Sequence, residues 1–338
     1  MKIRTSNKPV DEQALENSFV AVDDLETPMG TLSVAPLRND ELMPERPFEV
    51  KLTVHGKAAA ADALLGAGLS RGMYLAQQEG VPARIYAQCL PSETQKLELL
   101  LGLGFENDDA LVRMRRKVVG GLSIARLGEG MAFVEDRLDD ETERAFFLER
   151  EEKLFRKEKP EEWLEKLEKM NGFRRLLAVG RDGLAGELLL YETGTVGVVA
   201  QVYTAPARRR QHVAMFLLER ARQYFYQDRM QEAIADVRLR QTGAVALFAS
   251  AGYRQSEVVC RYPGVDLQAE PGRTSYRSAG PTATCCRGFW RRIREPYIGV
   301  PEFCGFPGLA RKTFIGIADS GCRGFWRRPL AAIDWSGQ

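Results

Sequence analysis

Residues 202–226 decide the fold, and they read VYTAPARRRQHVAMFLLERARQYFY. The stretch starts at the end of a predicted strand, 196–204, turns at a proline and passes through three consecutive arginines, 208–210. Apolar residues then recur every four positions, which predicts an amphipathic helix over 213–226. A strand that runs through a short loop into a helix presents the free N–H groups of the helix at that loop. Such a place stabilises a bound anion.

Around this stretch, the second half of the chain alternates between predicted strands and helices. Further strands are predicted over 121–125, 174–179, 185–191, 233–239 and 257–262, and helices over 139–157, 161–170 and 243–251. Turn residues at 181–183 and 193–194 are typical of hairpins, so the strands that they join should be antiparallel. The fold class that follows is α/β, with a mixed, mostly antiparallel central sheet flanked by helices.

The stretch 202–253 resembles the GNAT superfamily of N-acetyltransferases. The central motif of that family, [Arg/Gln]-x-x-Gly-x-[Gly/Ala], aligns with residues 209–214, where the arginine and the final alanine match and His212 stands at the usual glycine. A later family pattern, Asn-x-x-Ala-x-x-Leu-Tyr-x-x-x-Gly-Phe, aligns with residues 241–253. There the alanine, leucine and glycine match, and Phe248 replaces the usual tyrosine.

The first half looks like a shortened second copy of the same domain. Strands are predicted over 18–22, 30–34, 48–54, 84–88 and 110–114, and helices over 57–78 and 93–101. Residues 99–105 match the end of the later family pattern, but the junction at 54–59 lacks the arginine-led motif. The predicted organisation is therefore a degenerate GNAT-like domain, a GNAT N-acetyltransferase domain and a tail, over 1–117, 118–263 and 264–338.

The resemblance implies acetyl-CoA as the acyl donor and no metal. Its pyrophosphate would lie at the helix N-terminus, and its pantetheine arm would pair with the preceding strand. The implied cofactor-binding residues are Val202, Tyr203, Thr204, Arg209, Arg210, Gln211, His212, Val213, Ala214, Gln241 and Phe248. His212 is expected to contribute its backbone N–H, and the alternative is an imidazole that binds phosphate. Small residues are favoured in this loop because they let the backbone approach the ligand.

The family reaction, by the same resemblance, is direct attack of an amine on the thioester carbonyl. Such a reaction needs a base for the proton of the amine, and an acid can protonate the leaving thiolate. Phe248 has no proton to give in place of the usual tyrosine. Tyr253 and Tyr203 are the nearest phenols in the sequence, and Tyr253 is the candidate acid, although its position is more typical of a core aromatic.

For the base, the candidates are strand carboxylates. Glu187 and Glu192 lie on one predicted strand and Asp236 lies on another. Strand alternation places Glu187 on the same face as Leu189 and Tyr191, in partly apolar surroundings that suit a base. Glu187 is the residue we predict, and the alternative is an exposed carboxylate without a catalytic role.

The composition excludes several other functions. The 338 residues are 44% apolar and 28% charged with a net charge of +2, which is typical of a soluble globular protein and does not favour a nucleic-acid partner. No apolar run is long enough to span a membrane, and the start of the chain does not resemble a secretory signal, so we expect a cytoplasmic location. The expected partner is a small-molecule or peptide amine acceptor, and nothing in the sequence indicates the oligomeric state. The rival to an enzyme is a non-catalytic acyl-CoA-binding or protein-interaction module of the same fold.

The tail 264–338 differs in kind from the rest. It contains cysteine, arginine and tryptophan residues without a persistent period, and one heptapeptide, CRGFWRR, occurs at 286–292 and again at 322–328. Its cysteines lack the spacing of a zinc site. We expect a poorly ordered appendix. The alternatives are a nucleic-acid-binding arm and a segment translated in a shifted reading frame.

Overall fold

The computed structural model describes residues 1–121, 126–155 and 160–268. The tail beyond 268, with both copies of the heptapeptide, lies outside the described residues. The first half of the chain forms β1 (Lys2–Thr5), β2 (Ser18–Val22), β3 (Pro28–Arg38), β4 (Phe48–Gly56), α1 (Ala58–Glu79), β5 (Ala83–Ala87), α2 (Thr94–Gly102) and β6 (Ala110–Lys117). The second half forms β7 (Ala132–Asp136), α3 (Glu141–Phe155), α4 (Pro160–Glu168), β8 (Arg174–Gly180), β9 (Gly183–Thr193), β10 (Val196–Thr204), α5 (Val213–Gln227), β11 (Glu232–Arg238), α6 (Thr242–Ser250), β12 (Arg254–Arg261) and β13 (Gly264–Leu267).

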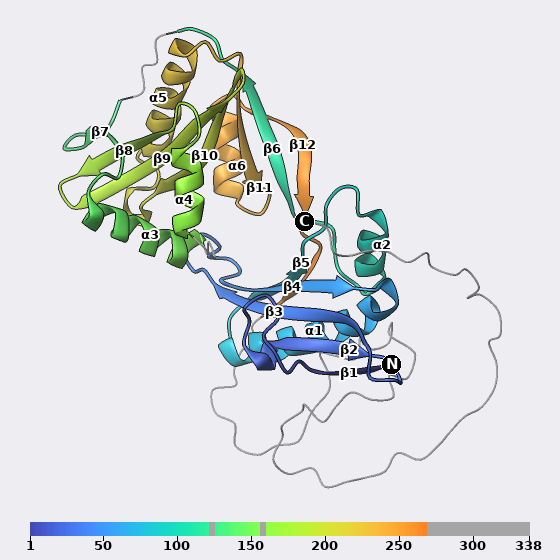
Figure 1. Cartoon of the computed structure of the whole chain (residues 1–338). Helices are drawn as coiled ribbons and strands as arrows, with labels where there is room; N and C mark the ends of the chain where they lie inside the picture. The colour runs from blue at the N-terminus through green and yellow to red at the C-terminus, as the bar shows by residue number, and fades with distance from the viewer. Residues whose placement is uncertain (122–125, 156–159, 269–338) are drawn as a thin grey trace.

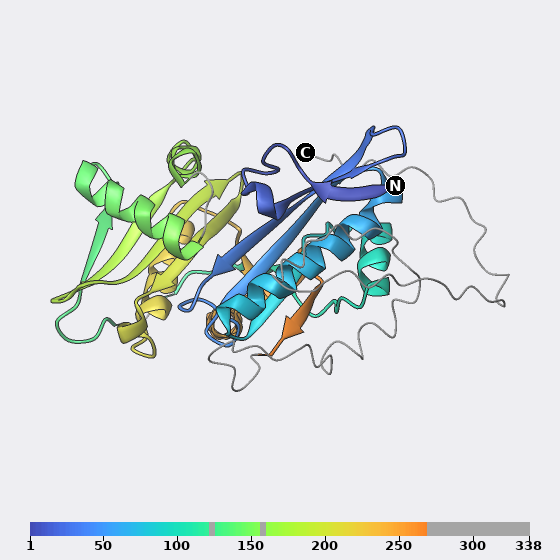
Figure 2. The same cartoon turned by 90° about the horizontal axis from the view of Figure 1, so that it is seen from below.

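These elements build two mixed, mostly antiparallel sheets flanked by helices, which confirms the predicted fold class (Figure 1). The first sheet has the order β1-β2-β3-β4-β5-β13, and the second has the order β12-β6-β11-β10-β9-β8-β7. The long helix α1 lies along one face of the first sheet (Figure 2). Each sheet has its own apolar core, because each alternating strand turns one set of side chains toward a helix.

The two halves repeat one pattern of pairing. In the first half, β2, β3 and β4 pair antiparallel and β4 pairs parallel with β5. In the second half, β8, β9 and β10 pair antiparallel and β10 pairs parallel with β11. The hairpins predicted at 181–183 and 193–194 are confirmed. Of the strand predicted over 121–125, residues 122–125 lie outside the described residues. The edge of the second sheet beside β8 is formed by β7, which the sequence did not indicate.

The two halves also exchange strands. Strand β6, predicted as the last strand of the first half, leaves the first sheet and lies between β11 and β12 in the second. Strand β13, in the segment predicted as tail, pairs antiparallel with β5 and completes the first sheet. The local sequence pattern specifies that a segment is extended but does not specify its partner, so the predicted boundaries at 117 and 263 do not coincide with the boundaries of the sheets. The division of the chain into domains at these two boundaries therefore remains a proposal.

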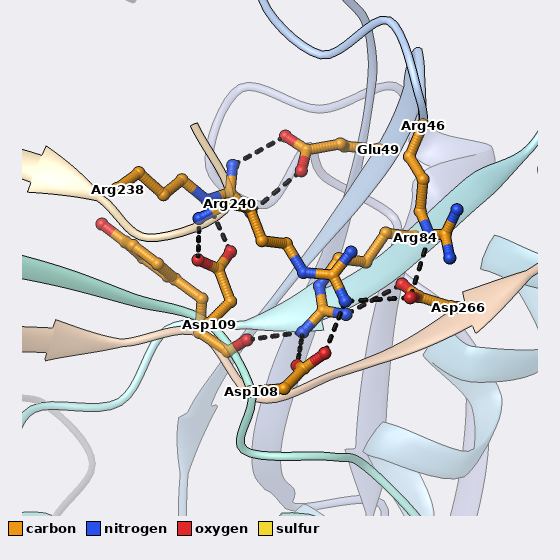
Figure 3. A network of polar contacts seen from close by, with 9 residues as sticks. Arg46, Glu49, Arg84, Asp108, Asp109, Arg238, Arg240 and Asp266 are labelled. Carbon is orange, nitrogen blue, oxygen red and sulfur yellow. Dashed lines mark hydrogen bonds and ion pairs between the residues drawn. The ribbon is translucent and has the colours of Figure 1, made fainter. Parts of the chain in front are cut away.

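A buried ionic network lies where the exchanged strands cross (Figure 3). Arg84 on β5 is 1% exposed and donates to Asp108 at 2.6 Å and to Asp266 on β13 at 2.8 Å. Arg240 donates to the same two carboxylates. The hydrogen bonds from Arg240 and Arg84 outweigh burial and hold the pKa of Asp266 below its usual range. At the crossing, therefore, the buried guanidinium of Arg84 is compensated by two partly exposed carboxylates, which Arg240 shares.

Candidate functional site

Strands β10 and β11 separate part-way along the second sheet. Their parallel pairing runs from Val196 opposite Glu232 to Val199 opposite Ala235 and ends there. Beyond a bulge after Val199, β10 continues on β9 as far as Thr204. Over 201–204, therefore, β10 is paired on its β9 side, and no β11 residue continues the ladder on the other side. Backbone N–H and C=O groups on that open edge are obligatory hydrogen-bonding groups that a ligand can satisfy.

The open edge leads into residues 205–212, which we call the cofactor loop because the resemblance assigns its second half to the cofactor. The loop begins with a single 3₁₀ turn, Pro206–Arg208. Gln211 donates its side-chain amide to the carbonyl of Ala207 at 3.1 Å, which holds the loop compact. The backbone is left-handed at Arg210, with φ of 64°, and at His212, with φ of 60°. These two positions turn the chain so that α5 begins immediately after the loop.

Helix α5 begins without a side-chain cap. The first main-chain bond of the helix joins the N–H of Phe216 to the carbonyl of His212 at 2.9 Å, and no side chain caps the helix at His212. The N–H groups of Val213, Ala214 and Met215 precede that bond, so they belong to the set that an α-helix leaves unpaired. Together with the helix dipole, these groups form a site that favours an anion.

Two features place this helix N-terminus at the end of β10. The predicted apolar face of α5, made by Val213, Leu217, Ala221 and Phe225, is fully buried on the sheet. Gly186 on β9, which pairs with Thr204, lets the helix approach, because a Cβ there would lie 2.6 Å from Cγ1 of Val213. The geometry of the loop is therefore set by the sheet beneath it.

The left-handed conformation at His212 gives a test of this loop. Substitution His212→Gly removes a Cβ from a backbone conformation that costs most residues about 1–2 kcal/mol, so we expect a gain of up to about 1 kcal/mol in the free energy of unfolding. Binding of acetyl-CoA should be kept or tightened, since the imidazole is exposed and caps nothing. Urea unfolding and calorimetric titration measure the two effects. If both His212→Gly and His212→Ala lost most of the affinity, the imidazole would be a ligand.

Glu187 lies on the predicted face of β9, since Leu189 and Tyr191 pack with it toward α3 and α4 while Leu188 and Leu190 face the opposite core. Its side chain is 1% exposed, so the alternative of an exposed carboxylate is wrong. Arg175 on β8 donates to one carboxylate oxygen at 2.5 Å, and Arg150 on α3 donates to the other. Both oxygens are thus held by guanidinium groups in a buried ion pair. A role of Glu187 as the base stays a prediction.

Substitution Glu187→Gln separates these two roles. If the carboxylate acts as a buried ion pair, we expect a loss of about 2–3 kcal/mol in the free energy of unfolding, because Arg175 and Arg150 each lose one of their charged partners and keep Asp136 and Glu151. Glu232→Gln removes an exposed ion pair from β11 and serves as the control, with an expected loss below about 1 kcal/mol. Unchanged stability with a large fall in turnover would instead identify Glu187 as the base.

The other predicted catalytic residue, Tyr253, lies in the core with its ring edge-on to Phe248 at 5.1 Å between centroids. Burial raises the pKa of Tyr253, and the guanidinium of Arg116 lies 5.6 Å above its ring. Phe248, predicted to bind cofactor, is 5% exposed and shares this core. Gln241 precedes α6 and donates its backbone N–H to Arg238. The structure therefore places Tyr253 in the core, the position that its sequence context was more typical of.

Tyr203 lies on the β10 face that carries Glu187, because the two residues are opposite each other in the ladder. The guanidinium of Arg150 lies 5.2 Å from the centroid of the Tyr203 ring. Burial, and then the carboxylate of Glu41, raise the pKa of Tyr203 to about 12, so the phenol stays protonated at neutral pH. Glu41 belongs to the first half. The sequence did not indicate that it is a site residue, since no local pattern connects it with β10.

A sequence profile of the acetyltransferase (GNAT) family matches residues 132–253, which include the separated strands, the cofactor loop and α5. Residues 132–253 form a GNAT domain. GNAT enzymes acetylate amine acceptors and typically use acetyl-CoA as the donor. No curated protein matches the chain significantly.

Among solved structures, this chain is similar to a GCN5-related N-acetyltransferase from Sphaerobacter thermophilus, with 19% identity over 78% of this chain and 84% of that one and a TM-score of 0.43. It is also similar to a tandem GNAT protein from the clavulanic acid biosynthesis pathway, with 14% identity over 76% of this chain and 83% of that one and a TM-score of 0.37. Because both TM-scores lie below 0.5, the family assignment of the GNAT domain rests on the sequence match.

Two further observations concern the described residues only. None of their helices is both long and apolar enough to cross a membrane. They also hold no group of three or more His, Cys, Asp or Glu side chains arranged to bind a metal ion.

Proposed function

We propose that the GNAT domain transfers an acetyl group from acetyl-CoA to an amine acceptor by direct attack of the amine on the thioester. The observation that carries the proposal is the open edge of β10 running into the uncapped N-terminus of α5. An extended amide-containing arm fits a strand edge, and a diphosphate fits a helix N-terminus. The residues present therefore fit the cofactor that the family uses.

In this proposal, the chain acts mainly by positioning. Acetyl-CoA supplies the activated carbonyl that the amine attacks. The backbone of Val202, Tyr203 and Thr204 would hold the pantetheine arm, and the N–H groups of Val213 and Ala214 would hold the diphosphate. Holding two reactants in line replaces a bimolecular encounter, which is worth several kcal/mol of the barrier.

The first half has no equivalent loop. Strand β4 ends at Gly56 and α1 begins at Ala58, whereas eight residues separate β10 from α5. The N–H of Lys57 at this junction already donates to the carbonyl of Met29 at 2.9 Å. Close backbone contact fills the remaining space, because a Cβ on Gly56 would lie 2.5 Å from Cα of Gly30. We therefore propose one cofactor site for each chain, in the second half.

The second candidate function is a non-catalytic acyl-CoA-binding or interaction module of GNAT fold. The position of Phe248 favours it, since the residue that replaces the family tyrosine carries no hydroxyl and is buried in the core. Tyr253 is buried beside Phe248, so its phenol is not exposed. A binder would hold acetyl-CoA without releasing free thiol.

Calorimetric titration of acetyl-CoA into the full chain tests the cofactor assignment. We expect saturable binding at one site for each chain, followed by release of free thiol when an accepting amine is found in a screen. Two sites would show that the first half also binds cofactor. Binding without thiol release from any amine would favour the non-catalytic module. No binding to folded protein would exclude the enzyme and the acyl-CoA binder, and would leave only an interaction module.

A further inference from the structure

The loop between β3 and β4, residues 39–47, reaches from the first half of the chain to the cofactor loop of the second. Glu41 accepts a hydrogen bond at its backbone carbonyl from Nη2 of Arg209 at 3.1 Å. The same Nη2 lies 3.7 Å from Oε1 of the Glu41 carboxylate. The hydroxyl of Tyr203 also interacts with this carboxylate. One side chain of the first half therefore touches two residues that the resemblance assigns to cofactor binding.

This loop is held firmly at both ends. The N–H of Asn39 donates to the carbonyl of Pro47 at 2.6 Å, and its side-chain amide donates to the carbonyl of Leu154 on α3 at 2.5 Å. At the far end, Arg46 forms an ion pair of 2.9 Å with Asp266 on β13. Glu41 is consequently presented to Arg209 by a fixed scaffold and not by a free surface side chain.

The charges around Glu41 decide what its carboxylate can do. Glu187, on the same side of the sheet, is held by two guanidinium groups. Arg208, next to Arg209, donates to Asp182 at 2.7 Å. Glu41 is 24% exposed and its Oε1 is buried, yet in the described part of the chain this oxygen accepts no hydrogen bond. The nearby, half-exposed Arg209 balances its charge, and the hydroxyl of Tyr203 is a neutral partner of the same carboxylate.

Arg209 is thus shared between two anions. It stands four residues before Val213, the first residue of α5, where the cofactor phosphates would bind, and it already faces a carboxylate. A negative charge near an anion site lowers the affinity of that site, and it also occupies the cation that would otherwise favour the anion.

We propose that Glu41 of the first half is an affinity-determining residue of the cofactor site in the second half, because its carboxylate neutralises Arg209 and opposes the phosphates of acetyl-CoA. The inference rests on the proposed function. It gives the degenerate half a role in the reaction: the first half sets how tightly the donor, and the CoA product that carries the same phosphates, are held.

Calorimetric titration of CoA into the full chain tests this inference with the variant Glu41→Gln. The amide keeps the size of the side chain and leaves the backbone carbonyl in place for Arg209. At low ionic strength, we expect Glu41→Gln to bind CoA about three- to fivefold more tightly than the wild type, the scale of one partly exposed charge pair. The difference should shrink as salt is raised to about 1 M, where the screening length for exposed charges falls to about 3 Å.

Glu45→Gln is the matched control, since Glu45 lies on the same loop and is exposed. It makes the same change in net charge and should leave the affinity unchanged. Equal or weaker binding by Glu41→Gln, a difference that salt does not reduce, or the same gain in Glu45→Gln would overturn the inference while leaving the proposed function intact. If folded wild-type protein bound no CoA at all, the proposed function would fail and the inference with it. Thermal unfolding of each variant shows that the samples are folded.

Discussion

Arg238→Met is expected to lower the free energy of unfolding by about 3–5 kcal/mol, the largest effect on stability that we predict. Arg238 on β11 donates to Asp109 at 2.7 Å and to Glu49 on β4 at 2.9 Å, so it joins the two sheets. The side chains of Asp109 and Glu49 are 0% and 5% exposed. Methionine fills the volume of the arginine stem but leaves two buried carboxylates without a cation. Urea unfolding of the full chain measures the loss.

Arg113→Met provides the matched control. Arg113 lies on β6, beside β11, and bonds Asp236 and Glu257, but its side chain is 29% exposed and theirs are 34% and 53% exposed. Removal of an exposed pair of this kind costs less than about 1 kcal/mol. Similar losses in the two variants would show that burial of the network does not determine its contribution. A second unfolding transition in Arg238→Met would further show that the network couples the sheets.

Ala214→Leu is expected to weaken acetyl-CoA binding by about 10- to 100-fold. Ala214 lies in the first turn of α5, where its N–H is free and where the resemblance places the phosphates. Added methylenes in a filled site typically cost about 1–3 kcal/mol, which converts to that range of affinity. Ala214 is only partly buried, so the stability of the protein should change little. Calorimetric titration measures the affinity, and thermal unfolding checks the fold.

Ala207→Leu controls for the loop itself, because Ala207 is exposed on the 3₁₀ turn of the same loop. It adds the same bulk away from α5 and should leave the affinity within about twofold. Unchanged binding in Ala214→Leu would remove the assignment of the phosphates to this helix N-terminus.

Local sequence patterns predicted most of the secondary structure. The four-residue period of α5 gave its buried face, and strand alternation placed Glu187 on the correct side of β9. These features follow from interactions within one element and its nearest neighbours. The turn chemistry at 181–183 and 193–194 likewise gave the hairpins of the second sheet.

The same local patterns could not predict which distant strands pair with each other. The four residues of β13 are extended because β5 offers them an edge, and the short segment carries no period of its own. The sequence also gave no sign that Glu187 would be buried between Arg175 and Arg150, which are 12 and 37 residues away. Contacts of Glu41 with Arg209 cross 168 residues. Such contacts depend on how complete elements pack, which no window of sequence contains.

The exchanged strands determine when each sheet can be completed during synthesis. Strand β5 leaves the ribosome early, but its antiparallel neighbour β13 emerges about 180 residues later, since Arg84 and Asp266 are 182 positions apart. Until then β5 is an uncovered sheet edge, a template for pairing with other chains. Contacts of such high contact order form late and slow folding. The first sheet, although it is synthesised first, is therefore completed last, and a nascent chain interrupted before residue 264 carries an unpaired edge on β5.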